Sequence, residues 1–431
     1  MKVRSMMWVC VALAALGIAS LSGCASFGRG IGEALLKSGE EEDTRQCWVR
    51  GRAFSGADMA MAHQDQVAAQ GRSEKPVLKM LMVHGIGSHA PGYSTRLAEN
   101  LARALSLDRV QEKFKEFRLS TPTMPGQELG TLRVTRYLHG GGTREMVFYE
   151  LTWDPIVEAE KHNIGFDNSG EYSFRRTTFN NALKVFVNET VPDVLTYNGR
   201  FRDPIQRSVG QALCWMMSDT WGGLPDGGTQ YCNALGPDGL NQLQDDFVFV
   251  THSLGSRITA DALQSLASAA STVPAFEEKA RVLQNKRFSL VMLSNQVPLL
   301  QLGQPEAEVR GQIDVICRPG APRAGERLFQ ETRIIAFSDP NDLFSYAIPP
   351  RFLDEHMDSR LCPTLTNVII NVAPITNVLG LGEFANPMSA HVNYDDDERV
   401  IALITHGIGG DETVQVVRDR CEWIEAVPEG E

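Results

Sequence analysis

The stretch THSLGS at residues 251–256 is the most informative part of this sequence. The apolar run FVFV at residues 247–250 leads into it, and an amphipathic segment from Arg257 to Leu266 follows. A buried strand, a tight turn and a helix in this order are typical of a serine held on a strained turn with its hydroxyl exposed. The first N–H groups of the helix can stabilise negative charge on a bound carbonyl. An ordinary strand-to-helix turn is the alternative, because serine flanked by small residues is common.

A second motif follows the first predicted core strand. The run VLKMLMV at residues 77–83 predicts a buried strand and leads into HGIG at 84–87, and a helix is expected from Thr95 to Leu105. Glycines let backbone N–H groups turn inward at low steric cost. The amides of Ile86 and Leu254 are therefore the candidate donors of an oxyanion hole. His84 is expected to brace this loop.

The glycine motif has a competing interpretation. Residues 85–90, GIGSHA, fit the dinucleotide fingerprint G-x-G-x-x-A, which should open a helix directly and lead to a second strand. Pro91-Gly92 interrupts the motif and residues 105–117 have a helical pattern, which disfavours dinucleotide binding. The tetrapeptide recurs at 406–409 after a helical run, where glycines signal a helix end, so His406 is expected to be a capping or surface residue.

An acid and a histidine follow Ser253, each after a predicted strand. The strand at 333–337 precedes Asp339 and Asp342, and the strand at 368–372 precedes a loop rich in glycine and proline that leads to His391. A serine hydroxyl is a poor nucleophile without a base, and the base needs an acid to orient it. The order serine, aspartate, histidine supplies all three groups.

Asp342 is the favoured acid and Asp339 the alternative. Pro340 biases the preceding residue toward an extended backbone, which makes Asp339 a turn residue. Its carboxylate is expected to accept from the N–H of Asn341 or of Asp342. His252, adjacent to the nucleophile, is expected to be a packed or hydrogen-bonded neighbour rather than the base.

With these residues in this order, the chain resembles the α/β-hydrolase superfamily, in particular its lipase- and esterase-like members, from about Pro76 to Trp423 apart from the middle. The resemblance implies an α/β fold with a mostly parallel central sheet flanked by helices. It also implies cleavage of carboxylic esters, acyl or lipid esters among them, through Ser253, Asp342 and His391 and an acyl-enzyme, without a cofactor. The superfamily usually has glycine two residues before the serine, where this chain has Thr251, whose branched side chain is expected to crowd the turn.

Other functions remain open on the same residues. A phospholipase, a thioesterase and an acyltransferase differ from an esterase only in acceptor and pocket, and a non-catalytic envelope module could use the fold for binding. A metal hydrolase is not indicated, because the sequence contains no HExxH motif. The acidic run at 395–398 is expected to begin a helix rather than bind calcium.

The middle of the chain, residues 154–241, is expected to be a helical insertion rich in aromatic residues. Two interpretations stay open. The aromatic side chains form the core of the insertion, or they cap the site and give an acyl chain an apolar wall.

The N-terminus predicts export. Lys2 and Arg4 precede a short apolar stretch at 6–19, and LSGC at 21–24 resembles the lipoprotein box. This implies a signal peptide at 1–23 and acyl chains on Cys24, which would anchor the protein in the bacterial envelope. No aspartate follows the cysteine, which favours the outer membrane, facing the periplasm. Residues 24–75 are expected to be a tether, and residues 76–431 the hydrolase domain.

Charge and cysteine content add two constraints. The net charge of −12 argues against nucleic acid and against electrostatic binding to anionic lipid. An even number of cysteines remains after Cys10 and Cys24, which in an exported protein suggests disulfides. The favoured pairs are Cys214–Cys232 and Cys317–Cys362.

Overall fold

The computed structural model describes residues 45–72, 75–110, 114–166, 177–236, 239–377, 383–410 and 413–425. The predicted signal peptide at 1–23 and the predicted lipidation site, Cys24, lie outside these residues. Among the helices that are described, none is both long and apolar enough to cross a bilayer.

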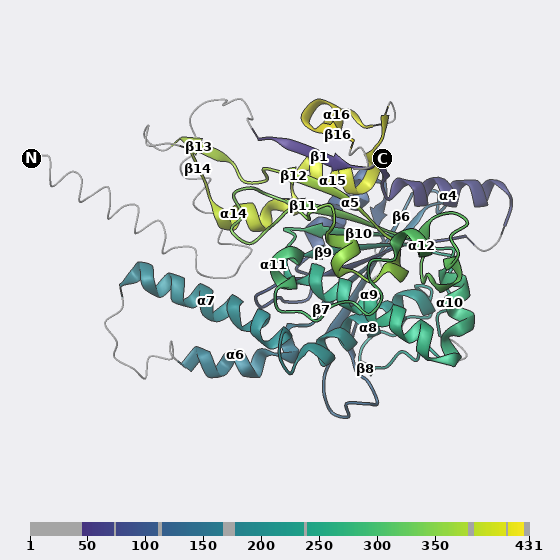
Figure 1. Ribbon diagram of the computed structural model, residues 1–431, viewed down its shortest axis with the longest axis horizontal. Helices are drawn as coiled ribbons and strands as arrows, with labels where there is room; N and C mark the ends of the chain where they lie inside the picture. The colour runs from purple at the N-terminus through teal and green to yellow at the C-terminus, as the bar shows by residue number, and fades with distance from the viewer. Residues whose placement is uncertain are drawn as a thin grey trace, which may run out of the picture.

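A mixed sheet of twelve strands runs through the described part of the chain (Figure 1). Its centre is parallel, and every residue of the strand at 78–83 is buried. Continuous apolar runs of this kind are typical of strands covered on both faces. The fold class, α/β with a mostly parallel sheet, is confirmed. The central strands, in spatial order, are β7 (Glu145–Thr152), β3 (Leu78–Val83), β9 (Asp246–His252), β10 (Arg287–Leu293), β11 (Glu331–Ser338) and β12 (Pro363–Ile370).

Four further strands extend the sheet beyond β7; the pairs that involve β6 are antiparallel, and β8 pairs parallel with β5. The helical pattern expected at 105–117 is wrong, because this region contains two strands that pair with β6. Phe117 and Leu119 alternate with exposed positions and turn into the core, which is the periodicity of a strand. The strands on this side are β4 (Asp108–Arg109), β5 (Lys115–Leu119), β6 (Thr131–Leu138) and β8 (Thr229–Gln230).

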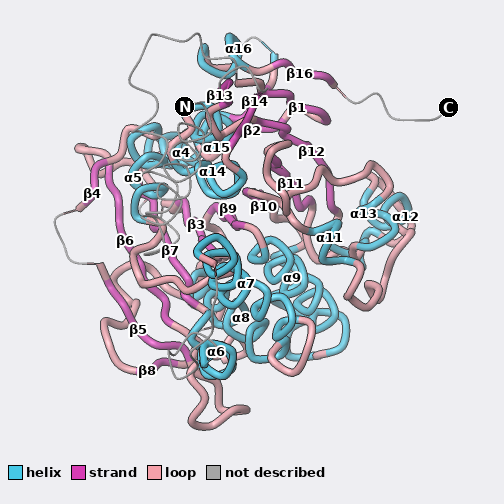
Figure 2. The backbone as a smooth tube through the Cα atoms, turned by 90° about the vertical axis from the view of Figure 1, so that its left-hand side faces the viewer, coloured by secondary structure: helices cyan, strands magenta, loops and turns pink. Residues whose placement is uncertain are grey.

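Helices cover both faces of the sheet and give the molecule two apolar cores (Figure 2). The first core lies under α8 (Arg202–Ser218), α9 (Leu254–Thr272) and α10 (Glu277–Leu283). The second lies under α4 (Asp58–Ala69), α5 (Thr95–Ala104), α15 (Glu398–His406) and α16 (Gln415–Arg420).

The folded body begins well before residue 76, which corrects the tether expected at 24–75. β1 (Cys47–Gly51) pairs antiparallel with β12 and parallel with β16 (Glu422–Ile424). The side chains of Cys47 and Val49 alternate into the core, so this short segment has an apolar face that only the sheet can cover. Two further elements follow it, β2 (Phe54–Ser55), which pairs with β15 (Gly407–Ile408), and α4.

The insertion expected at 154–241 divides into two parts. The helices α6 (Glu158–Gly165) and α7 (Thr178–Tyr197) extend away from the sheet (Figure 1). By contrast, α8 lies on the sheet, where its apolar face joins the core formed with β3 and β7. The described residues at 202–236 and 239–241 therefore belong to the body of the domain.

The described aromatic residues from Tyr197 to Trp221 belong to the core shared with the sheet and not to a separate core of the insertion. Tyr197 is fully buried in the core shared with the sheet, and Phe201, Trp215 and Trp221 pack against that core. Tyr172 and Phe174 lie outside the described residues, as do the side chains of Phe179 and Phe186.

Three disulfides join distant segments of the described chain. The pairs Cys214–Cys232 and Cys317–Cys362 are confirmed. The third, Cys47–Cys421, joins residues 374 positions apart and holds β1 near β16.

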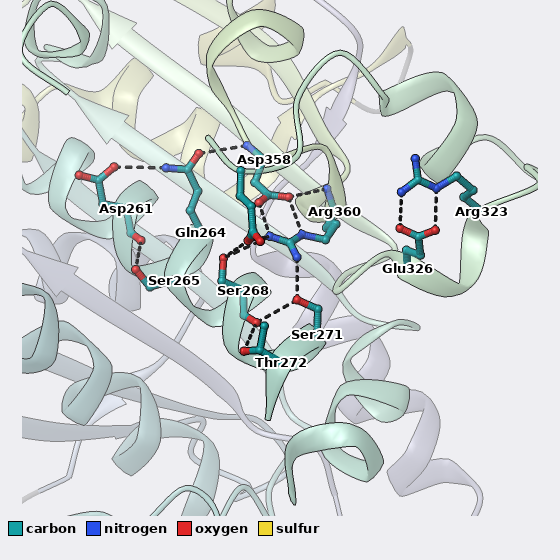
Figure 3. Close-up of polar contacts among 11 residues, drawn as sticks. Asp261, Gln264, Ser265, Ser268, Ser271, Thr272, Arg323, Glu326, Asp358 and Arg360 are labelled. Carbon is teal, nitrogen blue, oxygen red and sulfur yellow. Dashed lines mark hydrogen bonds and ion pairs between the residues drawn. The ribbon is translucent and has the colours of Figure 1, made fainter. Parts of the chain in front are cut away.

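The connections before and after β11 are tied to α9 (Figure 3). The guanidinium of the buried Arg360 donates to both carboxylate oxygens of Asp358, at 2.9 and 2.6 Å. It also donates to Ser271 of α9 at 2.8 Å and to Glu308 at 2.7 Å. These bonds hold the helix that follows the serine turn. The remaining elements are α11 (Val297–Gln301), α12 (Ile313–Cys317), α13 (Phe352–His356), β13 (Ile375–Asn377), β14 (Glu383–Ala385) and α14 (Pro387–Val392).

Candidate active site

Ser253 stands between the end of β9 and the start of α9 in a left-handed conformation. Its φ is 55° and its ψ is −124°. A positive φ is uncommon for a residue with a side chain and costs about 1–3 kcal/mol when the surroundings enforce it. The serine is buried, and its Oγ has no hydrogen-bond partner among the described residues. The turn therefore holds an unpaired hydroxyl at the carboxyl end of a central strand of the parallel sheet.

Two glycines allow the backbone to close around this serine. A Cβ on Gly255 would lie 2.3 Å from the carbonyl oxygen of Val83, so the start of α9 can approach the end of β3 only with glycine there. A Cβ on Gly85 would lie 2.5 Å from the Cβ of Ser253 and 2.9 Å from its Oγ. The loop that contains Gly85 thus passes directly over the serine side chain.

Thr251 fits the turn without the expected crowding. Its hydroxyl donates to the carbonyl oxygen of Val291 on β10 at 2.9 Å and lies 3.0 Å from the Oγ of Ser256. The branched side chain is therefore directed at the neighbouring strand, where it ties β9 to β10.

His391 and Asp342 form a buried pair. Nδ1 of His391, on α14, lies 2.9 Å from Oδ2 of Asp342, which follows β11. The other carboxylate oxygen accepts the N–H of Phe344 at 2.9 Å. Burial acts to raise the pKa of Asp342, but the hydrogen bond and charge of His391, with a hydrogen bond from Ser294, hold this pKa below its usual range. Asp342 is therefore ionised at neutral pH and orients the imidazole.

The Nε2 atom of His391 is also buried without a hydrogen-bond partner among the described residues. The ring of His252 lies 4.9 Å from the ring of His391, between centroids, and His252 directly precedes Ser253. The site thus holds two unpaired polar atoms, a serine hydroxyl and an imidazole nitrogen, which are the atoms that a nucleophile and its base would pair.

Asp339 lies in the same loop as Asp342 but has a different set of contacts. One carboxylate oxygen accepts the N–H of Asn341 at 2.8 Å, as expected for a turn residue, and the other accepts the N–H of Val372 at 2.7 Å. Asp339 therefore joins the ends of β11 and β12, and Asp342 is the aspartate that contacts His391.

His252 is a hydrogen-bonded neighbour, as expected. Its Nε2 lies 2.7 Å from the carbonyl oxygen of His391, so this nitrogen donates. Burial, with the nearby charge of His391, lowers the pKa of His252 from 6.5 to about 3. The neutral ring supports the backbone of His391.

His84 braces the glycine loop, also as expected. Its Nδ1–H donates to the carbonyl oxygen of Gly85 at 2.9 Å, and its Nε2 accepts the N–H of Trp153 at 3.1 Å. The Trp153 indole donates to the carbonyl oxygen of His84 at 3.0 Å. These bonds fix the backbone immediately before Ile86, the candidate oxyanion donor. Leu254, the other candidate, is the first residue of α9, where N–H groups have no acceptor within the helix.

The loop is also held from the projecting helices. The N–H of Gly87 donates to Oδ2 of the buried Asp193 on α7 at 2.7 Å. Lys161 on α6 forms an ion pair with the same carboxylate at 2.7 Å. The helix α7 therefore contacts the candidate oxyanion loop directly, and α6 supports this contact through Lys161, a link that no local sequence pattern predicts.

Ser294 is a site residue that the sequence did not identify. It follows β10, and its Oγ lies 2.6 Å from Oδ2 of Asp342 and 2.8 Å from Nδ1 of His391. The only signal in the sequence is a serine directly after an apolar strand.

One group of possible metal ligands occurs among the described residues, namely His84, His89 and Asp154, whose ligand atoms lie within 4.8 Å of one another. The two imidazoles are stacked at 4.0 Å with planes 26° apart, so the ring lone pairs lie in nearly parallel planes. Nε2 of His84 already accepts the Trp153 N–H. This geometry suits a packed brace better than a metal centre.

The second HGIG copy has a structural role, as expected. Gly407 ends α15 with a φ of 70°, and His406 pairs with Asp58 at 2.9 Å. The acidic run before α15 begins that helix, because Asp397 accepts the N–H of Arg399 at 3.0 Å.

Comparison of the chain with protein-family models, with curated proteins and with solved structures gives no match, so the functional assignment depends on the geometry of these residues.

Proposed function

We propose that this protein is a serine hydrolase that cleaves carboxylic esters, with Ser253 as nucleophile, His391 as base and Asp342 as the orienting acid. The observation that carries the proposal is the buried pair at 2.9 Å between His391 and Asp342. It lies beside a serine that the backbone holds in a left-handed turn at the end of a central strand. An unpaired hydroxyl and strained backbone have a cost, and nucleophilic catalysis explains why both are retained.

In each half of the proposed mechanism, His391 first accepts a proton and then gives it up. His391 Nε2 takes the proton of Ser253 as Oγ attacks the ester carbonyl, and the amides of Ile86 and Leu254 stabilise the oxyanion. The protonated histidine then gives its proton to the leaving alcohol, which leaves an acyl-enzyme. Water, deprotonated by His391, cleaves that intermediate, and Ser253 regains its proton. Asp342 stays ionised and stabilises the imidazolium.

The sheet supports assignment to an α/β-hydrolase fold. The serine follows β9, the acid follows β11 and the histidine follows β12, and all three strands belong to one parallel set. The carboxyl ends of parallel strands lie at the same sheet edge, which is where ligands bind in α/β proteins.

Acyl or lipid esters are the substrate class that we favour. Val187, Val191 and Leu195 are exposed on α7 at four-residue spacing, which gives that helix an apolar row at the surface. The same helix contacts the candidate oxyanion loop through Asp193. A phospholipase, thioesterase or acyltransferase would use the same groups with another acceptor.

Export and lipid anchoring are part of the proposal. The three disulfides support an oxidising compartment, since disulfides are rare in the cytosol. We place the protein in the bacterial envelope, held by acyl chains on Cys24 and facing the periplasm. Metabolic labelling with a palmitate analogue should mark the wild type and not Cys24→Ala, and equal labelling of both would refute the anchor.

The catalytic proposal is tested with a fluorophosphonate probe, which reacts only with an activated serine. The wild type should be labelled and should hydrolyse p-nitrophenyl esters, with chain-length preference measured over a graded series. Ser253→Ala should fold, remain unlabelled and lose turnover. Ser218→Ala is the matched control, because it removes another buried serine hydroxyl, one that accepts the N–H of Leu240 at 2.8 Å. Undiminished labelling of Ser253→Ala would contradict the assignment, and a folded wild type without labelling would indicate a binding module.

A further inference from the structure

Two neighbouring parallel strands of the sheet end in the same unusual way. Ser253 follows β9 with a φ of 55°, and Ser294 follows β10 with a φ of 50°. Glycine would adopt this conformation at lower cost, so a serine there is expected to make a contact that only its side chain can supply.

Ser294 makes that contact with the pair Asp342 and His391. The carboxylate accepts, so the hydroxyl of Ser294 donates its one proton to Oδ2 of Asp342 at 2.6 Å. The Oγ atom of Ser294, whose lone pairs can still accept, lies 2.8 Å from Nδ1 of His391. That nitrogen lies 2.9 Å from the same Oδ2. Three polar atoms form a closed triangle in which every proton has an acceptor.

Because these three residues are buried, the loss of any hydrogen bond among them is costly. Ser294 is fully buried, and Asp342 and His391 are 6% and 5% exposed. In such surroundings, the loss of one of the two donors to a carboxylate oxygen is costly. The N–H of Phe344 serves the other oxygen, so Ser294 supplies the second donor at the oxygen that faces the histidine.

We propose that Ser294 is a positioning residue of the site, a fourth member that acts through Asp342 and His391 without touching the substrate. Its hydroxyl fixes the carboxylate so that Oδ2 accepts the Nδ1–H of His391. That hydrogen bond keeps the proton on Nδ1 and leaves the lone pair of Nε2 for Ser253. The kinetic part of this inference depends on the proposed hydrolase function, whereas the effect on His391 does not.

Two variants distinguish the effect of the Ser294 hydroxyl from the effect of the backbone conformation at this residue. Ser294→Ala removes the hydroxyl and keeps the cost of the positive φ, whereas Ser294→Gly removes both. Each should lower kcat by between about 10-fold and 100-fold with KM unchanged, which is the range for losing a hydrogen bond to a charged group. Ser218→Ala, which loses a buried serine hydroxyl in α8, should keep the wild-type kcat. Wild-type kcat in the glycine variant would overturn the proposal, because only the backbone would then matter.

A spectroscopic measurement tests the same role without turnover. In protein labelled with ¹⁵N-histidine, the imidazole Nδ1–H signal of His391 is the one that His391→Gln lacks. It should be downfield and slow to exchange in the wild type, and it should broaden and exchange with solvent in both Ser294 variants but not in Ser218→Ala. An unchanged signal in the Ser294 variants would overturn the proposal. A changed signal in a protein that no fluorophosphonate labels would support Ser294 as a positioning residue and reject the hydrolase function.

Discussion

The Nε2 atom of His252 donates a hydrogen bond to the carbonyl oxygen of His391 at 2.7 Å. The residue before the candidate nucleophile thus supports the backbone of the candidate base, so we expect the two variants His252→Gln and His252→Phe to differ. Glutamine offers an N–H donor and should keep most of the turnover. Phenylalanine leaves a buried carbonyl unpaired and should cost about 1–3 kcal/mol of stability and part of kcat. Equal kinetics for the two variants would contradict this role.

The same histidine should make stability depend on pH. Burial lowers its pKa from 6.5 to about 3, so between these values the unfolded chain binds a proton that the folded protein does not. The contribution of His252 to folding is therefore complete above about pH 6.5 and is lost as the pH falls toward 3. Urea denaturation of the wild type and His252→Gln at pH 7 and pH 4.5 should show a smaller acid-induced loss in the variant. Parallel losses would contradict the expected direction.

Asp342 and Asp339 should separate activity from stability. Asp342→Asn keeps the shape but presents the wrong hydrogen-bonding group to His391, and it should lower turnover by a factor on the order of 10⁴. Asp339→Asn weakens the bonds to Asn341 and Val372 and should cost about 1–3 kcal/mol with kcat preserved in the folded fraction. Ester hydrolysis and thermal unfolding of both variants check this, and the reverse order would make Asp339 the acid.

Gly255 and Gly210 provide a matched pair of glycines in helices. Gly255→Ala places a Cβ 2.3 Å from the carbonyl oxygen of Val83, so β3 or α9 must move. We expect a loss of about 1–3 kcal/mol or more, together with lower turnover because the serine turn shifts. Gly210→Ala on α8 meets no atom within 4 Å and should gain about 0.5–1 kcal/mol from helix propensity. Equal melting temperatures for the two variants would contradict the close packing of α9 on β3.

Lys79 and Asp245 form a buried ion pair at 2.8 Å under α8. Burial lowers the pKa of Lys79 and raises that of Asp245, and the attraction between the two charges opposes both shifts. Lys79→Met leaves a buried carboxyl without its partner and should cost about 3–5 kcal/mol in urea denaturation. The double variant Lys79→Met/Asp245→Asn should recover much of that loss, because an amide oxygen still accepts the N–H of Val77. Lys79 also donates to the carbonyl oxygens of Met216 and Asp219, at 2.8 and 2.7 Å, and a double variant as unstable as the single would show that these bonds dominate.

Sequence patterns correctly predicted those parts of the fold that depend on residues close together in the chain. The strand and helix around Ser253, the end of α15 at Gly407 and the turn role of Asp339 all follow from rules that act within a few residues. The proline argument favoured Asp342, and the structure places Asp342 against His391.

The parts that local patterns could not predict depend on distant partners. β1 is short, and its pairing with β12 joins residues more than 300 positions apart. Because no local pattern reveals such a partner, the polar sequence around β1 indicated a tether. The apolar face of α8 has the same periodicity whether it covers the sheet or a separate cap. Ser294 carries no motif, because its role arises only where the ends of β10 and β11 meet.

The pairing of β1 with β12 and β16 also determines when this chain can finish folding. Synthesis runs from the N-terminus, so β1 emerges long before either neighbour exists and waits with unpaired edges and a free thiol at Cys47. The bond to Cys421 can form only after 374 further residues have been made. A product truncated before β16 would therefore keep a free thiol at Cys47 and leave one side of β1 unpaired, which are features that a quality-control protease or thiol oxidoreductase can detect. Only a chain that contains β16 and Cys421 can pair that edge of β1 and bond its thiol.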